Sequence, residues 1–96
     1  MLKNFYYTNI TFNQQEHGPG LVVKGEVTNR SGRQWSAVAF RIILFIKTIP
    51  IGNATFTING FCNGQTRRFE KQIGELEHSK VAKDITRCEV YAESGY

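Results

Sequence analysis

The sequence is poor in proline and cysteine and has no long apolar segment. Its 96 residues include two prolines and two cysteines, and the longest apolar run is Ile42–Ile46. A membrane-spanning helix needs about 20 such residues, so we expect no membrane insertion by this segment. Residues 1–12 also lack the continuous apolar stretch of a signal peptide, although a domain cut from a secreted or anchored parent would look the same. The compartment therefore stays open, with an extracytoplasmic or envelope-associated location expected if the chain comes from a larger protein.

Basic residues are scattered along the chain. The formal net charge is +4, charged residues make up 21%, and Arg67-Arg68 is the one adjacent basic pair. Domains that bind nucleic acid usually carry a basic stripe interleaved with exposed aromatic residues. We therefore expect no nucleic-acid partner.

The sequence also lacks a set of residues that would catalyse a reaction or hold a metal. The two cysteines and two histidines do not have zinc-site spacing, and no phosphate-binding glycine motif occurs. His17 and His78 have glutamate neighbours only along the chain, without a nucleophile and an orienting group. We expect no enzyme activity, no cofactor and no metal. The alternative is a small-ligand site in the loops around His17 and His78.

Cys62 and Cys88 allow two interpretations, a disulfide or two free thiols. Immunoglobulin-type bridges join two strands, whereas Cys62 falls in an expected loop. No signal peptide is visible to indicate an oxidising compartment. We therefore expect free thiols, with Cys88 behaving as a small apolar residue if it faces the core.

What the sequence does contain is a series of short β-branched and aromatic runs separated by glycine-containing turns. The predicted strands cover residues 5–12, 21–29, 35–47, 54–58, 65–73 and 85–93. Turns are expected at 48–52, where Pro50 would block pairing, and at 59–64. Segment 75–84 is the least strand-like, and we expect one helical turn or a loop that crosses between sheets.

These elements predict one all-β domain over residues 1–96. No helix is available between consecutive strands, which excludes a parallel sheet with helical crossovers. The best fit is an immunoglobulin-like two-sheet antiparallel sandwich of six or seven strands, with a small β-barrel as the alternative.

The clearest periodicity lies in the third predicted strand. Alternate positions from Val38 to Ile46 are strongly apolar, which indicates a central strand with one face in the core. Leu21, Val23 and Val27 alternate with polar residues in the same way.

Three segments resemble FxLYD-type domains, a family of bacterial immunoglobulin-like accessory domains. They are VKGEVTNRSGR at 23–33, the run Ile42–Ile46, and the stretch 60–66 followed by Phe69. Leu44 matches the family's Leu and Phe45 stands for its Tyr, while Ile42 and Ile46 replace its Phe and Asp. The likeness covers about residues 22–69. It implies an immunoglobulin-like sandwich that serves as an accessory module, often outside the cytoplasm, with no catalytic residues to transfer.

The outer face of the third strand is more apolar than a solvated face should be. In an immunoglobulin-like order the third and last strands are neighbours, so one surface is expected to gather Trp35, Arg41, Ile43, Phe45, Arg87 and Tyr91. Apolar patches rimmed by arginine are typical of protein interfaces. We therefore expect contact with a protein partner or a second copy, unless residues 5–7 or 75–84 cover this face. A weaker alternative is binding of an acidic polymer through Arg67, Arg68 and Lys71.

Overall fold

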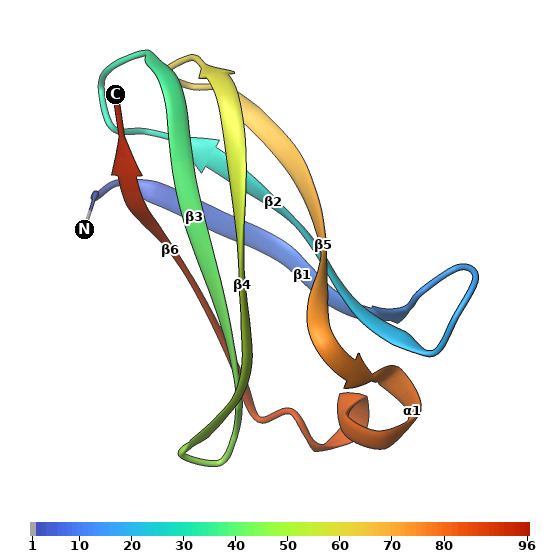
Figure 1. Ribbon diagram of the computed structural model, residues 1–96. Helices are drawn as coiled ribbons and strands as arrows, with labels where there is room; N and C mark the ends of the chain where they lie inside the picture. Colours follow the sequence, from blue (N-terminus) through green and yellow to red (C-terminus); the bar gives the residue numbers. More distant parts are fainter. Residues whose placement is uncertain (1) are drawn as a thin grey trace.

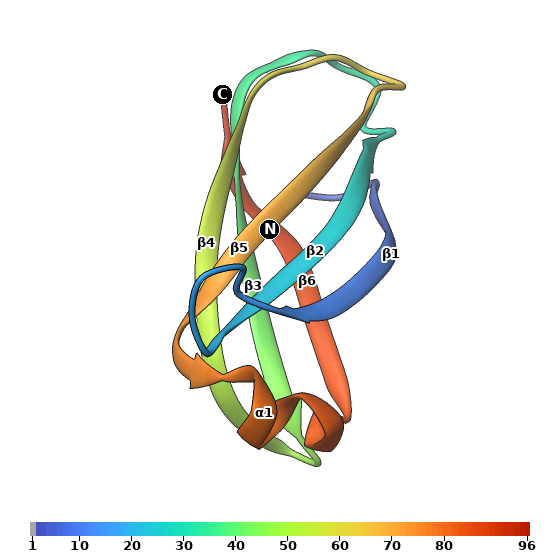
Figure 2. The same cartoon turned by 90° about the vertical axis from the view of Figure 1, so that its right-hand side faces the viewer.

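The computed structural model describes residues 2–96, apart from the side chain of Glu75. Six strands form two three-stranded antiparallel sheets, with the orders β1-β2-β5 and β4-β3-β6. Figure 1 shows the strands along the chain, and in Figure 2 β2 and β5 run diagonally across the nearly upright β3 and β4. The elements are β1 (Phe5–Gln14), β2 (Gly20–Asn29), β3 (Trp35–Ile46), β4 (Ile49–Phe61), β5 (Thr66–Glu77), α1 (His78–Val81), a 3-10 turn (Ala82–Asp84) and β6 (Arg87–Gly95).

The molecule is an all-β antiparallel two-sheet sandwich, as the sequence predicts, with six strands and without a closed barrel. The third strand is central in its sheet, and its neighbour β6 is the last strand, as expected. Each sheet therefore has two edge strands, β1 and β5 in one and β4 and β6 in the other.

The core fills the space between the two sheets. Val38, Phe40, Ile42 and Leu44 are fully buried, and residues of β2 face them from the other layer. Phe56 stacks between two rings, at 5.0 Å from Phe40 and at 4.6 Å from the buried Phe69 of β5. Such aromatic pairs add about 1 kcal/mol each beyond the area that they bury. The alternation read from the sequence is thus the inward face of the central strand.

The turn expected at 48–52 is shorter than predicted. β4 already begins at Ile49 and continues to Phe61, so it also takes in the first residues of the loop expected at 59–64. Pro50 lies within β4, opposite Phe45, beside a register shift in the ladder. Proline is tolerated there because β4 is an edge strand and the ladder is already irregular at that point.

The segment 75–84 connects the two sheets. β5 extends to Glu77, and a single turn of α-helix and a 3-10 turn then lead to β6 in the other sheet. α1 lies at one end of the sandwich (Figure 1), where it contacts β1, β2 and β5. The expected helical turn and sheet crossing are both present, but the strand before them is longer than predicted.

Asn29 is a fully buried polar residue at the end of β2. Its amide donates to the backbone carbonyls of Arg33 and Phe61, at 3.0 and 3.1 Å. Its Oδ1 accepts from the N–H and hydroxyl of Ser31, and that hydroxyl accepts from the Trp35 indole. One side chain thus joins the β2–β3 turn to the end of β4.

Candidate functional site

The outer surface of β3 and β6 carries most of the residues expected to meet a partner. The register places Arg41 opposite Tyr91 and Phe45 opposite Arg87, with Ile43 between them. All of these side chains are partly or largely exposed. We call this surface the β3–β6 face, defined by Arg41, Ile43, Phe45, Arg87, Glu89 and Tyr91.

The upper part of the β3–β6 face is organised by ion pairing. The guanidinium of Arg41 donates to the carboxylate of Glu93 and, through Nη1, to Oδ1 of Asn53 at 2.8 Å. The hydrogen bond to Glu93 raises the pKa of Arg41, so its positive charge is held in place. These contacts fix the direction of the arginine side chain on the outer side of β3.

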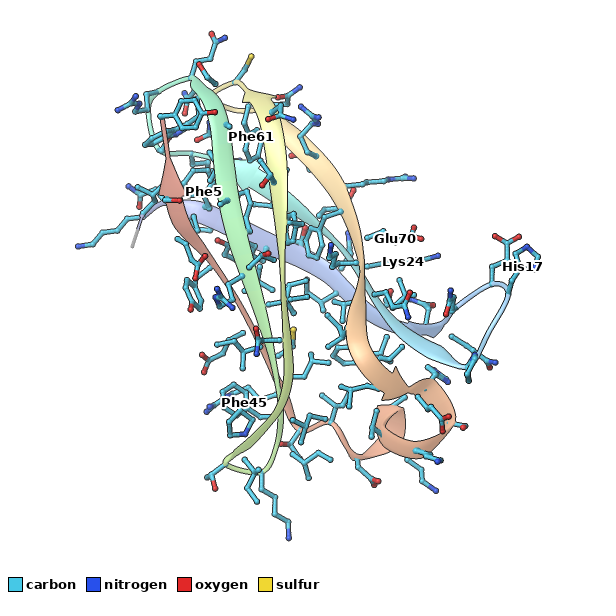
Figure 3. The ribbon with its side chains drawn as sticks, viewed as in Figure 1. Phe5, His17, Lys24, Phe45, Phe61 and Glu70 are labelled. Atoms are coloured by element: carbon cyan, nitrogen blue, oxygen red, sulfur yellow. The ribbon has the colours of Figure 1, made fainter. Side chains whose placement is uncertain are left out.

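The lower part of the face combines an aromatic ring with a cation. The guanidinium carbon of Arg87 lies 4.2 Å from the centre of the Phe45 ring, and its Nη2 lies 3.1 Å from Oε2 of Glu89. Phe45 projects from the lower end of β3 in Figure 3. The guanidinium covers one face of the Phe45 ring and leaves the rest of the ring open to a partner. Aromatic residues and arginines are both enriched in protein interfaces.

Trp35 does not belong to this exposed surface. It is buried at 7% exposure and lies in the core beside Phe5, with ring centres 6.5 Å apart. The alternation breaks in both strands of the pair. In β3 the N–H groups of Ser36 and Ala37 both donate to the carbonyl of Tyr96, which is a bulge, and in β4 Gly60 has a left-handed φ of 61 just before Phe61, the residue paired with Trp35. Trp35 and Val38 are therefore both buried although they are three residues apart, so simple alternation assigns Trp35 to the wrong side.

Neither of the two segments considered as covers lies across the β3–β6 face. Residues 5–7 belong to β1, which pairs with β2 in the opposite sheet. Segment 75–84 packs at the end of the sandwich against β1, β2 and β5. Within the described residues, Ile43 and Phe45 are shielded only by neighbours of their own sheet.

The basic residues considered for acidic polymers do not converge. Arg67 and Lys71 share the side of β5 that bears Phe69, whereas Arg68 points to the opposite side. Arg67 donates to the backbone carbonyl of Asn59, and Arg68 is 91% exposed at 4.0 Å from a carboxylate oxygen of Glu26. The separation gives no basic patch on either side.

The outer face of the other sheet contains a shallow hollow of about 480 Å³. Lys24 and Glu70 lie side by side there (Figure 3), 3.9 Å apart, near the Arg68–Glu26 pair. Because both signs are balanced within the hollow, it has no preference for a charged ligand of one sign.

The histidines are placed apart from the β3–β6 face. His17 lies at the tip of the β1–β2 hairpin, far from Phe45 in Figure 3, and its side chain is 89% exposed. His78 begins α1, and its backbone N–H donates to the carbonyl of Pro19. Across residues 2–96, no group of three or more His, Cys, Asp or Glu side chains is arranged to hold a metal.

Both cysteines are free thiols, as expected. Cys62 follows β4 beyond Phe61, which pairs with Trp35, whereas Cys88 pairs with Leu44. Those two positions of β3 are roughly 30 Å apart along the strand, far beyond the reach of a disulfide. Burial raises the pKa of the Cys88 thiol to about 11, with a smaller contribution from Glu89. Cys88 is therefore a poor nucleophile at neutral pH.

A groove beside β6 was not anticipated from the sequence. It measures about 670 Å³ and is lined by Tyr7, Ile10, Ile43, Cys88, Glu89, Val90 and Tyr91. β1 supplies the first two residues from the opposite sheet. The pKa of Tyr7 is raised to about 12, mainly by burial, while an interaction with the Ala92 backbone opposes the rise. Tyr7 lines this groove because of the way the two sheets stack. The alternation of residues within one strand does not reveal that stacking.

The described residues contain no helix long and apolar enough to cross a bilayer. In comparisons with protein-family models, curated proteins and solved structures, nothing matches the chain. The likeness to FxLYD-type domains accordingly stays a prediction carried by the residues quoted for it. The candidate site rests on the β3–β6 face itself.

Proposed function

We propose that this chain is a non-enzymatic binding or accessory module that contacts another protein through the β3–β6 face. The observation that carries the proposal is the pair Ile43 and Phe45 on the outer side of a central strand, partly exposed and covered by no other element of the described chain. Arginines flank both residues. An apolar centre with an arginine and tyrosine rim is the composition of protein interfaces.

An extracytoplasmic accessory role agrees with the likeness to FxLYD-type domains and is part of the same proposal. The alternative of an acidic-polymer or small-ligand site is less well supported, because Arg67 and Arg68 point to opposite sides of β5. The His17 side chain is largely exposed at a hairpin tip, which supports no ligand pocket around it.

The test compares Phe45→Asp with Thr57→Asp in affinity capture from extracts of the source cells. Thr57 lies exposed on the outer side of the same sheet, opposite Ala39, so it is a matched control for adding a charge. We expect a protein that is captured by the parent chain and by Thr57→Asp and is lost with Phe45→Asp. Circular dichroism and thermal unfolding verify that each variant is folded.

Capture that is equal for all three chains would refute the proposal. If Phe45→Asp fails to fold, the milder Phe45→Ala serves in its place, because it removes the ring without introducing a charge. Loss of folding with Phe45→Ala would mean that the ring is a core element, which also refutes the proposal.

A further inference from the structure

The four sheet edges differ in how well they are protected against pairing with another strand. β1 has a bulge with Asn9 at φ 56, β4 contains Pro50, and β5 is irregular near Gly74, whose φ is 46. Bulges, prolines and kinks are the usual devices that prevent edge-to-edge association. Residues 87–91 of β6 contain no proline, no lysine and no left-handed residue. We call the unpaired side of this stretch the β6 edge.

The β6 edge presents free backbone groups. The N–H of Leu2 donates to the carbonyl of Ala92 at 3.0 Å, on the side of β6 away from β3. In an antiparallel ladder, alternate residues direct both backbone groups to the same side. Cys88 and Val90 therefore direct their N–H and C=O groups to this edge, where no described residue pairs with them. The Leu2 contact shows that an extended antiparallel backbone fits beside Ala92, next to this stretch.

The side chains of the β6 edge differ in character between the two faces of the sheet. Arg87 and Glu89 lie on the outer side with opposite charges, 3.1 Å apart. Cys88 and Val90 lie on the inner side, where they line the groove together with Tyr7 and Ile10. The edge thus offers an apolar strip inside and alternating charge outside.

We propose that the β6 edge pairs antiparallel with the β6 edge of a second copy of this chain, in a register centred on Cys88. In this register Arg87 of each copy lies opposite Glu89 of the other, so opposite charges meet at both positions. Directly opposed residues in such a pair interact favourably when their charges are opposite. On the inner side Cys88 meets its own copy, and Val90 lies opposite Thr86, the residue before β6.

Neighbouring registers fit less well. Centring on Glu89 would place two glutamates opposite each other, which is unfavourable. Centring on Val90 would place Cys88 opposite Ala92, whose carbonyl already accepts from Leu2. The register centred on Cys88 leaves the Leu2 contact in place and pairs both charges.

This inference goes beyond the proposed function and does not rest on it. The pairing would join two sheets into one of six strands, and it would bring two β3–β6 faces side by side on the same surface. Arg87 and Glu89 belong to both surfaces, whereas Phe45 lies on the β3–β6 face alone and Cys88 on the β6 edge alone. A dimer that uses the β6 edge should therefore form the Cys88 disulfide and survive Phe45→Asp, and an interface on the face should do neither.

The first test exchanges charges. Arg87→Glu alone places Glu opposite Glu89, and Glu89→Lys alone places Lys opposite Arg87, so each chain by itself should dimerise about tenfold more weakly than the parent. Mixed together, the two variants place opposite charges at both positions and should form a heterodimer. Sedimentation equilibrium over a wide concentration range measures all three cases. If a variant dimerised weakly because its own fold had changed, mixing it with the other variant would not restore dimerisation.

The second test uses the native Cys88 as a reporter in the Cys62→Ser background. Cα atoms directly opposite each other in a hydrogen-bonded antiparallel pair are about 5.5 Å apart, within disulfide range. Diamide, a thiol oxidant, should therefore join two chains through Cys88, taking two electrons and two protons from the two thiols. Cys88→Ser with Cys62 retained is the matched control. Cys62 is the more exposed thiol, so its covalent dimer arises by collision and should disappear on dilution, whereas the Cys88 dimer should persist as long as the two chains stay paired.

A chain that stays monomeric at all accessible concentrations overturns the proposal. So does a dimer that is lost with Phe45→Asp and is indifferent to the charge exchange, because such a dimer would use the β3–β6 face. Recovery on mixing together with disulfide formation through Cys88 supports it.

Discussion

Replacing Asn29 by alanine should remove a large part of the stability of this domain. The side chain is fully buried and makes two donor contacts to carbonyls and two acceptor contacts with Ser31. Each buried hydrogen bond contributes about 1 kcal/mol net, and an abandoned buried partner costs more. The carbonyl of Phe61 would be left inside, whereas Ser31 and Arg33 can turn to water. We expect a loss of about 2–4 kcal/mol, a substantial fraction for a domain whose total is about 5–15 kcal/mol.

Asn29→Asp tests the same site with almost no change of shape. The new carboxyl keeps the acceptor for Ser31 but turns an oxygen toward the carbonyls of Arg33 and Phe61. Burial and these carbonyls disfavour the charged form, so the pKa of the new carboxyl in the folded state should lie above its unfolded value. A group with a raised folded pKa loses its stabilising contribution as pH rises, so the deficit relative to the parent should grow between about pH 4 and pH 7.

Urea unfolding at both pH values, followed by circular dichroism, measures these differences in the free energy of unfolding. Asn59→Ala is the matched control, since Asn59 is an exposed asparagine in β4. We expect that control to change stability by less than about 0.5 kcal/mol. If Asn29→Ala costs no more than Asn59→Ala, or if the Asn29→Asp deficit is the same at both pH values, the side chain is solvated and the reasoning is wrong.

Three further predictions concern the core and the groove. Gly25→Ala should destabilise the domain by about 1–3 kcal/mol, because a Cβ there would lie 2.7 Å from Cζ of Phe69; unchanged urea unfolding would contradict this. The raised pKa of Tyr7, about 12 against a usual 10.0, means that its phenol favours the folded state below pH 10 and loses this effect as pH rises toward 12. Tyr7→Phe should therefore flatten the fall in stability over that range by on the order of 1–2 kcal/mol, and an unaltered slope would show that the phenol is solvated. Iodoacetamide should label Cys62 much faster than Cys88 at pH 8, because a pKa raised from 9.0 to about 11 lowers the thiolate population roughly a hundredfold; mass spectrometry of each peptide gives the two rates, and equal rates would count against the burial of Cys88.

The inward face of β3 was predictable because side chains of a regular strand alternate between its two faces. The alternate apolar residues in the sequence therefore identify the buried face. The buried residues Val38, Phe40, Ile42 and Leu44 are the alternate positions that the sequence singles out. The neighbouring placement of β3 and β6 followed from the expected sandwich order. These features depend on regular backbone, where position along the strand decides direction.

The errors occur where the backbone leaves that regularity. Trp35 was expected outside, but the bulge at Ser36 and Ala37 breaks the alternation in β3, as the left-handed Gly60 does before Phe61 in β4, and the indole is buried. β4 was expected to start after Pro50, but an edge strand with a register shift accepts proline. The groove between Tyr7 and β6 depends on the stacking of two sheets, which no local pattern encodes. Gly60, one residue before an aromatic, was the one available signal of the first error.

The distribution of apolar residues separates the demands of folding from those of binding. Folding requires only the inner face of β3 to be apolar, because the outer face has no second layer against it. A threonine or lysine at Ile43 or Phe45 would serve the sandwich equally well, as Thr55 and Thr57 do on the outer side of β4. The cation that lies on Phe45 reduces the exposure of its ring but does not require the ring. Stability therefore gives no reason for these two residues, and their removal should affect association while leaving the free energy of unfolding nearly unchanged.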